Sequence, residues 1–297
     1  MTRITVAGNR WAAVAKLAGP LSGKGPKIRV LTTHPRQARE LCGEGGVEFM
    51  KIEMNDPLAL RVAFQDSDRV LLCTGGPDWP VRYDIALIDA AVRAGVPYLV
   101  NLSDGDGGEG RGRTALNGRS EIDEYLRGQP VLATRVHPVI EMNAVLTVAA
   151  DFLSLGQWGG MAGNGRAGLV DGRDVADAVA RVLLDGPAIH AGKVYHLTGP
   201  APVTMGYIAD FLAENLARRV IYHRRCAEDQ RGVYLRAGLS SARIETLMQR
   251  DHMIRRGYFD FATGDTAGLI GRPARTVDDW LREHLIEFPV PFVDAQT

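Results

Sequence analysis

The stretch ITVAGNRWAAV, Ile4–Val14, decides the fold, because a short apolar run gives way at a glycine to apolar residues at helical spacing. This order predicts a strand, a tight turn and a helix. In dinucleotide-binding folds such a turn carries three glycines, which let the backbone approach a pyrophosphate at the helix N-terminus. Gly8 keeps the first of these positions, whereas Trp11 and Val14 occupy the other two. The stretch therefore indicates a dinucleotide-binding topology with an altered phosphate turn.

Strand-like and helix-like segments alternate along the rest of the first half. Short apolar runs predict strands, and between them lie segments with helical spacing, some opened by a proline or an acidic cap. The expected strands cover 28–32, 47–53, 69–73, 97–102 and 131–136, and the expected helices cover 35–41, 57–64, 83–94 and 121–126. Repeated units of this kind predict an α/β fold with a doubly wound, parallel, Rossmann-type sheet. Ligands of such sheets lie at the carboxyl ends of the strands, where the strand order reverses.

The second half changes character. A capped, alanine-rich helix is expected over 171–180, a strand over 193–198, and further helices over 205–216 and 240–250. We expect residues 1–150 to form the Rossmann-type domain and residues 151–297 a smaller, mostly helical lobe on the substrate side. No long linker separates the two halves, so the chain is expected to cross between them.

Composition narrows the function classes. The 297 residues are 45% hydrophobic and 24% charged, which predicts a packed core. Basic and acidic residues number 35 each, so nothing favours nucleic acid or an anionic membrane as a partner. Three scattered cysteines, no signal-like apolar run and no membrane-length segment predict a cytoplasmic protein without a disulfide framework. A small molecule is the expected partner, no cluster has metal-binding spacing, and a homodimer stays open.

Several phrases, in this order, resemble the NmrA-like family of atypical short-chain dehydrogenase/reductase proteins over nearly the whole chain. They lie at 47–70, 88–96, 121–126, 170–177, 195–200 and 271–284. The resemblance implies a Rossmann-type domain, a small C-terminal lobe and a cleft between them. Members of the family include NAD(P)H-dependent reductases of quinones and other small molecules, non-redox enzymes, and regulators that bind a dinucleotide without turning it over.

The chain departs from the family at its cofactor positions. An indole at Trp11 would occupy space that phosphate oxygens need. The family often has arginine after the second strand, but this chain has Thr33, and Arg36 nearby either takes over a ribose 2′-phosphate or simply belongs to a solvated helix start. No convincing Tyr-x-x-x-Lys pair is present. We expect no cofactor or weakly bound NAD(P), and NADP(H) if the family function is retained. The cofactor contacts would then be Gly8, Asn9, Arg10, Trp11, Thr33, Arg36 and Gly75.

Candidate catalytic groups follow the strands expected near 100 and 134. His137 exchanges protons near neutral pH and is the first choice for a general acid or base, although a structural histidine beside Pro138 is an alternative. Glu141 either orients His137, titrates itself or caps the next helix. Ser103 closes the preceding strand without a Gly-x-Ser-x-Gly elbow, so a hydrolase triad is not expected. The glycine-rich segment 104–112 reads as a lid or a disordered loop.

Candidate substrate-binding residues surround the same crevice. Planar aromatic side chains there suit a flat ligand, although tryptophan equally serves to pack lobes together. Arg119 stands where many relatives have lysine or histidine and is too basic for an ordinary proton relay. The candidates are Trp79, Tyr83, Asn101, Arg119, Asn143 and Trp158.

Three functions are compatible with these observations. The first is proton-transfer chemistry, such as cyclisation, isomerisation or dehydration, on an aromatic or polyketide-like substrate of secondary metabolism. This hypothesis rests on the altered turn and the polar segment around His137. The second is an NAD(P)H-dependent oxidoreductase of quinone- or enone-type substrates. The third is a non-catalytic regulatory or binding protein, because a fold alone does not fix function.

Overall fold

Seven parallel strands form the central sheet, in the order β11-β6-β5-β4-β1-β2-β3. The computed structural model describes residues 2–10, 15–17, 21, 25–42, 47–75, 79–103, 119–154, 158–217 and 219–288. The strands are β1 (Arg3–Gly8), β2 (Lys27–Thr32), β3 (Val47–Lys51), β4 (Arg69–Cys73), β5 (Tyr98–Leu102), β6 (Leu132–Pro138) and β11 (Val194–Leu197). β1 lies between β4 and β2, so the strand order reverses there. This confirms the expected doubly wound sheet, and it puts the reversal of strand order, where ligands of such sheets are expected, at β1 and β4.

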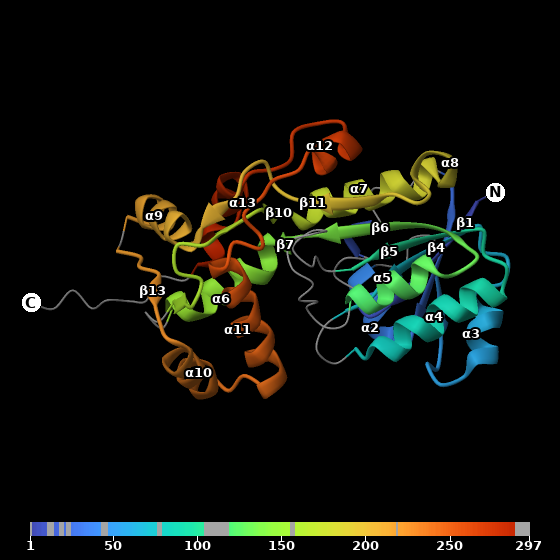
Figure 1. Cartoon of the computed structure of the whole chain (residues 1–297), viewed down its shortest axis with the longest axis horizontal. Coiled ribbons are helices and arrows are strands. Elements are labelled where there is room, and N and C mark those ends of the chain that lie inside the picture. The colour runs from blue at the N-terminus through green and yellow to red at the C-terminus, as the bar shows by residue number, and fades with distance from the viewer. Residues whose placement is uncertain are drawn as a thin grey trace, which may run out of the picture.

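Helices cover both faces of the sheet (Figure 1). Alternate residues of β4 show why both faces are covered, since Leu71 packs on the α7 side and Leu72 on the α4 side. On one side lie α2 (Pro35–Cys42), α7 (Gly172–Asp185) and α12 (Asp265–Ile270); on the other lie α3 (Pro57–Ala63), α4 (Val81–Arg93) and α5 (Arg119–Arg127). The apolar run at 69–73 therefore reflects burial on two sides.

Acidic caps fix where two of these helices begin. Asp56 accepts hydrogen bonds from the backbone N–H groups of Leu58 and Ala59, at 3.1 and 2.9 Å, so α3 starts at Pro57. Asp171 caps α7 in the same way through the Arg173 N–H at 2.7 Å. Both caps stand where the sequence placed them.

A second lobe adjoins the carboxyl ends of the strands, because β6 leads directly into it (Figure 1). Its core is a separate apolar cluster that draws on residues from 139 to 169, from 205 to 259 and from 277 to 288. Its helices are α6 (Met142–Ser154), α9 (Met205–Asn215), α10 (Ala227–Arg236), α11 (Ser241–Arg255) and α13 (Val277–Glu283), followed by the 3₁₀ turn η2 (Leu285–Glu287). Short strand pairs join them: β7 (Ile140–Glu141) with β10 (Leu169–Val170), β9 (Arg166–Ala167) with β12 (Val203–Thr204), and β8 (Gly159–Gly160) with β13 (His223–Arg224).

Several elements that follow residue 150 pack against the sheet of the first lobe. α7, the short α8 (Pro187–His190), β11 and α12 all come after residue 150, yet β11 pairs with β6 and α7 and α12 pack on the first-lobe core. β11 pairs with β6 at the edge of the sheet. This pairing brings the chain back from the second lobe to the first. Part of the segment 151–297 therefore packs with the first-lobe sheet.

No helix among the described residues combines the length and apolarity that crossing a bilayer requires. No group of His, Cys, Asp or Glu in that part of the chain is arranged to hold a metal ion.

Candidate functional site

The ends of β1 and β4 approach each other closely. A Cβ at Gly8 would collide with the carbonyl oxygen of Cys73, and Gly8 has a φ of 147°. Asn9 then fastens the two loops, because its Nδ2 donates to the Gly75 carbonyl at 2.8 Å and its Oδ1 accepts from the Gly75 N–H at 3.1 Å. Trp11, with the rest of 11–14, lies outside the described residues. The chain thus keeps a tight turn at Gly8, the first of the three expected glycine positions.

Charged groups stand beside this turn. Arg10 donates to Glu141, and the two side chains are 18% and 16% exposed. The Lys16 ammonium and the Glu141 carboxylate also lie close to Gly172, the first residue of α7. A Cβ at this position would meet both groups. Glu141 is thus held by Arg10 rather than by His137, so the expectation that it orients His137 is wrong. The cause is topological, since Glu141 lies on β7, which turns toward β10.

The end of β2 is polar and lacks a carboxylate at the position after the strand. Thr33 Oγ1 lies 2.8 Å from His34 Nδ1, and the His34 N–H donates to Thr32 Oγ1 at 2.8 Å. Arg36 is exposed in the first turn of α2. An acid at this edge would accept from a ribose 2′-hydroxyl, whereas an arginine suits a 2′-phosphate.

A buried polar network ends β5 and β6. Ser103 Oγ lies 2.8 Å from His137 Nδ1, and Asp123 Oδ2 lies 2.9 Å from His137 Nε2. Asn101 Nδ2 donates to Asp123 Oδ1 at 3.4 Å, and Arg135 Nη1 lies 3.9 Å from Asp123 Oδ2. Ser103 is 4% exposed and His137 is 3% exposed. Both ring nitrogens of His137 therefore have polar partners within the protein.

Asp123 is the member of this network that sequence reasoning missed. It lies on α5, which packs across β6, and nothing in its local sequence distinguishes it from other acids. The helical pattern over 121–126 gave the only signal, since Ile122 and Leu126 on the core side also place Asp123 close to the sheet. Asn101 Oδ1 is buried and accepts no hydrogen bond from the described residues, so it has capacity for one more donor.

Trp79 and Tyr83 lie beyond the end of β4. Their rings meet edge to face with centroids 5.3 Å apart, and Trp79 Nε1 donates to Asp84 Oδ2 at 3.1 Å. Thr74 also donates to Asp84, which joins the β4 loop to the start of α4. Both aromatic side chains stay half-exposed. Their role in substrate binding stays a prediction.

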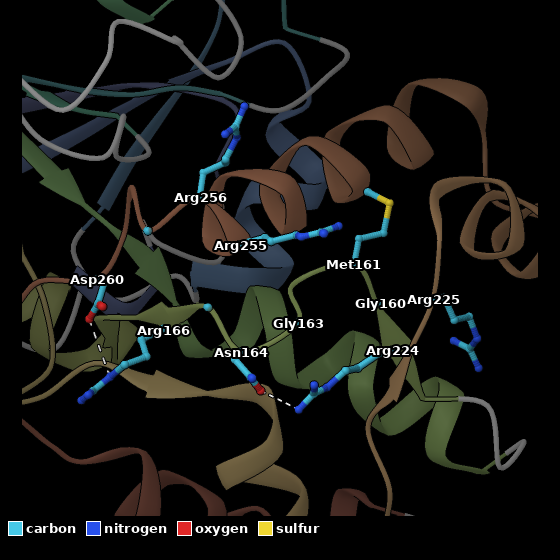
Figure 2. A pocket seen from close by; sticks show the side chains of 12 residues that line it. Gly160, Met161, Gly163, Asn164, Arg166, Arg224, Arg225, Arg255, Arg256 and Asp260 are labelled. Atoms are coloured by element: carbon cyan, nitrogen blue, oxygen red, sulfur yellow. Dashed lines mark hydrogen bonds and ion pairs between the residues drawn. The ribbon is translucent and has the colours of Figure 1, made fainter.

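A cavity of about 690 Å³ lies in the second lobe (Figure 2). Five arginines from three separate segments line it, together with glycines and Asp260; the arginines are Arg166, Arg224, Arg225, Arg255 and Arg256. The sequence shows two of these segments as arginine pairs about thirty residues apart. Nothing local indicates that β13 and the end of α11 bring the pairs together.

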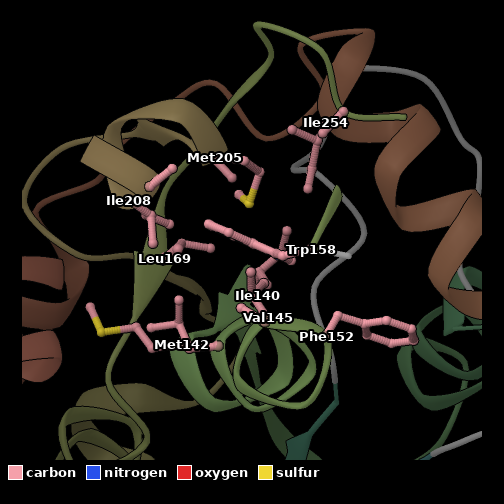
Figure 3. Close-up of a cluster of buried hydrophobic side chains, with 14 of the residues drawn as sticks. Ile140, Met142, Val145, Phe152, Trp158, Leu169, Met205, Ile208 and Ile254 are labelled. Atoms are coloured by element: carbon pink, nitrogen blue, oxygen red, sulfur yellow. The ribbon is translucent and has the colours of Figure 1, made fainter. Parts of the chain in front are cut away.

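The remaining substrate-binding candidates lie in different parts of the structure. Trp158 is 4% exposed inside the second-lobe core, where its ring meets Tyr222 edge to face at 5.3 Å (Figure 3). It packs the lobe and offers no open face to a ligand, so its expected ligand contact is corrected to the packing alternative. Asn143 is exposed in the first turn of α6. Arg119 begins α5, and its side chain and the segment 104–118 lie outside the described residues.

Proteins of similar sequence include reductases, and proteins of similar structure include a reductase, a protein named as an epimerase and a negative transcriptional regulator. The model of the NmrA-like family matches residues 3–229. The (4-alkanoyl-5-oxo-2,5-dihydrofuran-3-yl)methyl phosphate reductase of Streptomyces griseus is 31% identical over 287 residues, 96% of this chain and 99% of the relative. The NAD(P)H azoreductase of Xenophilus azovorans is 26% identical over 263 residues, 88% of this chain and 90% of the relative.

The fold recurs in a solved structure of the NADPH-dependent quinone oxidoreductase QOR2 from Escherichia coli, complexed with NADPH. The TM-score is 0.83, the identity is 23%, and the alignment covers 95% of this chain and 99% of the other. A parallel sheet of the same kind, a family match over most of the chain and a relative above 30% identity agree with one another. The chain belongs to the NmrA-like family.

Proposed function

We propose that the protein is an NAD(P)H-dependent reductase of a small molecule whose electron-poor double bond is conjugated to a carbonyl group. The observation that carries this proposal is the nearly full-length similarity to a furanone phosphate reductase. An azoreductase and a quinone oxidoreductase support it. These relatives favour the reductase hypothesis over cyclase or isomerase chemistry.

The residues at the edge of the sheet fit a dinucleotide. The Gly8 turn leaves room only for backbone at the end of β4, and Asn9 holds the Gly75 loop beside it. Asn9 and Arg10 would hold the diphosphate, Thr33 and Arg36 the adenosine ribose, and Gly75 would border the nicotinamide half. Arg36 and the absence of an acid at position 33 favour NADPH over NADH. When bound, the reduced cofactor supplies a hydride.

Reduction of a conjugated double bond also consumes one proton, and this chain has a route for it. If His137 is protonated, its Nδ1–H donates to Ser103 Oγ, which leaves the hydroxyl hydrogen free to pass to the substrate. The Nδ1 proton then moves to Ser103. Asp123 keeps the ring oriented by accepting from Nε2 at 2.9 Å. Ser103 is the proposed contact with substrate, and His137 and Asp123 act through it.

Substrates of the relatives define the test compounds. The Streptomyces griseus enzyme is named for an unsaturated lactone that carries an alkanoyl group and a methyl phosphate. A quinone shares only the double bond conjugated to a carbonyl. We therefore choose the alkanoyl furanone phosphate, the matching hydroxymethyl furanone without phosphate, and a benzoquinone.

Cofactor oxidation, followed at the nicotinamide absorbance with each compound, tests the proposal. We expect NADPH oxidation that depends on the furanone, with a higher kcat/KM for NADPH than for NADH. Arg36→Gln should lower the preference for NADPH about tenfold without changing kcat, because a ribose 2′-phosphate would lose its cation. Arg61→Gln, an exposed charge on α3, is the matched control. If calorimetry finds no binding of either nucleotide, the reductase proposal is overturned.

A further inference from the structure

An ion pair joins the turn after β1 to the second lobe. Arg10 donates to Glu141, and the two side chains are only 18% and 16% exposed. The backbone of Arg10 is held at the end of β4, because its N–H donates to the Cys73 carbonyl at 3.2 Å and its own carbonyl accepts from Cys73 Sγ at 3.9 Å. Glu141 lies on β7, whose other residue, Ile140, packs in the second-lobe core. The guanidinium of Arg10 therefore extends from the first lobe to a carboxylate of the second.

A second cation lies near the carboxylate of Glu141. An added Cβ at Gly172 would contact Lys16 Nζ and would lie 3.0 Å from Glu141 Oε2, so the ammonium and the carboxylate flank the same point at the start of α7. Removing one partner from a partly buried ion pair is costly when the remaining charge has no other compensation. Lys16 is positioned to compensate the charge of Glu141 when Arg10 binds a different anion. The Arg10–Glu141 pair can therefore open without leaving Glu141 uncompensated.

We propose that Glu141 competes with the diphosphate of NAD(P)H for the Arg10 guanidinium and thereby sets the affinity of the protein for its cofactor. A guanidinium binds carboxylate and phosphate oxygens through the same N–H donors, so one partner can replace the other. The proposal rests on the proposed reductase function for the identity of the nucleotide. Its physical basis is independent of the reaction, because the carboxylate of Glu141 already occupies the cation beside the phosphate turn.

The altered turn gives this competition its importance. Trp11 and Val14 occupy two positions where dinucleotide-binding turns have glycine, whose small size lets backbone N–H groups approach the phosphates. The arginine at position 10 offers the diphosphate charged donors that do not depend on a close approach of the backbone. A guanidinium that is neutralised by a carboxylate attracts a doubly charged anion less strongly than one without such a partner. Affinity for the nucleotide should therefore rise when the charge of Glu141 is removed.

A double-mutant cycle of NADPH binding, measured by calorimetry on the full chain, tests the competition. Glu141→Gln should bind NADPH about tenfold more tightly than wild type, and Arg10→Gln about tenfold more weakly. In the Arg10→Gln background, Glu141→Gln should no longer tighten binding, because the contested cation is absent. Glu48→Gln is the matched control, since Glu48 pairs with Arg29 at 3.0 Å between β2 and β3, and it should bind NADPH as wild type does. An equal gain with and without Arg10 would show that Glu141 only repels the nucleotide, and this result, or no gain at all, would overturn the proposal.

Inorganic diphosphate separates this proposal from the reductase proposal, because it carries the anion without the nicotinamide or the adenosine. Glu141→Gln should bind inorganic diphosphate about tenfold more tightly than wild type, but adenosine 2′-monophosphate, which lacks a diphosphate, equally well. If the ion pair serves only to join the lobes, Glu141→Gln will lower the melting temperature and leave both affinities unchanged, which would overturn the proposal. Tighter diphosphate binding in Glu141→Gln without any furanone-dependent oxidation of NADPH would contradict the reductase proposal alone. Normal furanone reduction with an unchanged affinity of Glu141→Gln for NADPH would contradict this proposal alone.

Discussion

Gly8 shows how a single residue sets the cofactor edge. Its φ of 147° and its contact with the Cys73 carbonyl leave no room for a side chain. Gly8→Ala should therefore lower the free energy of unfolding by about 1–3 kcal/mol and weaken NADPH binding. Urea denaturation and calorimetry check the two effects. Gly268→Ala, in α12 where a Cβ would meet no atom within 4 Å, should be neutral or stabilising, so equal losses in both variants would contradict the explanation.

Ser103 should matter for chemistry more than for stability. Ser103→Ala removes the hydroxyl between His137 and the substrate, and we expect kcat to fall about 100-fold with little change in KM for NADPH. Ser67→Ala is the matched control, because Ser67 is equally buried and its hydroxyl bonds only to Thr5 at the opposite end of the strands. A kcat that stays unchanged in Ser103→Ala would rule out the relay.

Between elements, the polar tie from α7 to the C-terminal segment holds the two lobes together. Asp174 is fully buried, accepts from Arg272 at 2.8 Å and from the Arg275 N–H at 2.7 Å, and also binds the Arg275 side chain. Asp174→Ala should cost about 3 kcal/mol of unfolding free energy, since two arginines then lose a buried partner. Asp177→Ala gives the control, because Asp177 shares Arg272 but is 38% exposed, and it should cost less than about 1 kcal/mol. Thermal denaturation of both variants measures the difference.

Elements with a strong local pattern could be predicted, and contacts between distant elements could not. The strand at 69–73 has the predicted bounds because burial on both faces leaves a continuous apolar run. α12 and α13 were missed, since they are short and their stability comes from packing on α7 and on the second-lobe core. Ser103 and His137 could be chosen as candidates because they follow predicted strand ends, whereas the contact of Asp123 with His137 required knowing which helix covers β6.

At the scale of the molecule, the return of the chain to the sheet makes the two lobes interdependent. β11 adds an edge strand to β6 after the second lobe has begun, and its end is held by Thr263 and Asp265. The last strand of the sheet is thus held by a segment that follows α11 of the second lobe.

The buried carboxyl of Asp251 makes the stability of the second lobe depend on pH. It accepts from the Met161 N–H at 2.9 Å, and a Cβ at Gly160 would meet both its oxygen and the Tyr222 hydroxyl. Desolvation raises the pKa of Asp251 above its usual value, with Arg250 and the Met161 N–H opposing the shift. A raised pKa means that the folded state holds the proton more tightly than the unfolded chain does. Protonated Asp251 therefore contributes its full stabilisation of the folded state below about pH 4. This contribution is lost as the pH rises through the pKa of Asp251 in the folded state.

Asp251→Asn should remove the loss of folding stability at higher pH, because asparagine does not ionise. The amide keeps an acceptor for the Met161 N–H and costs less to bury than a carboxylate, so the variant should be about 1–2 kcal/mol more stable than wild type at pH 7. The difference should shrink toward zero near pH 4, where the wild-type carboxyl is protonated as well. Urea denaturation from pH 4 to 8 measures both, with Asp210→Asn on the exposed face of α9 as the control. An advantage that is the same at pH 4 and pH 7 would show that packing or hydrogen bonding, and not ionisation of Asp251, separates the two proteins.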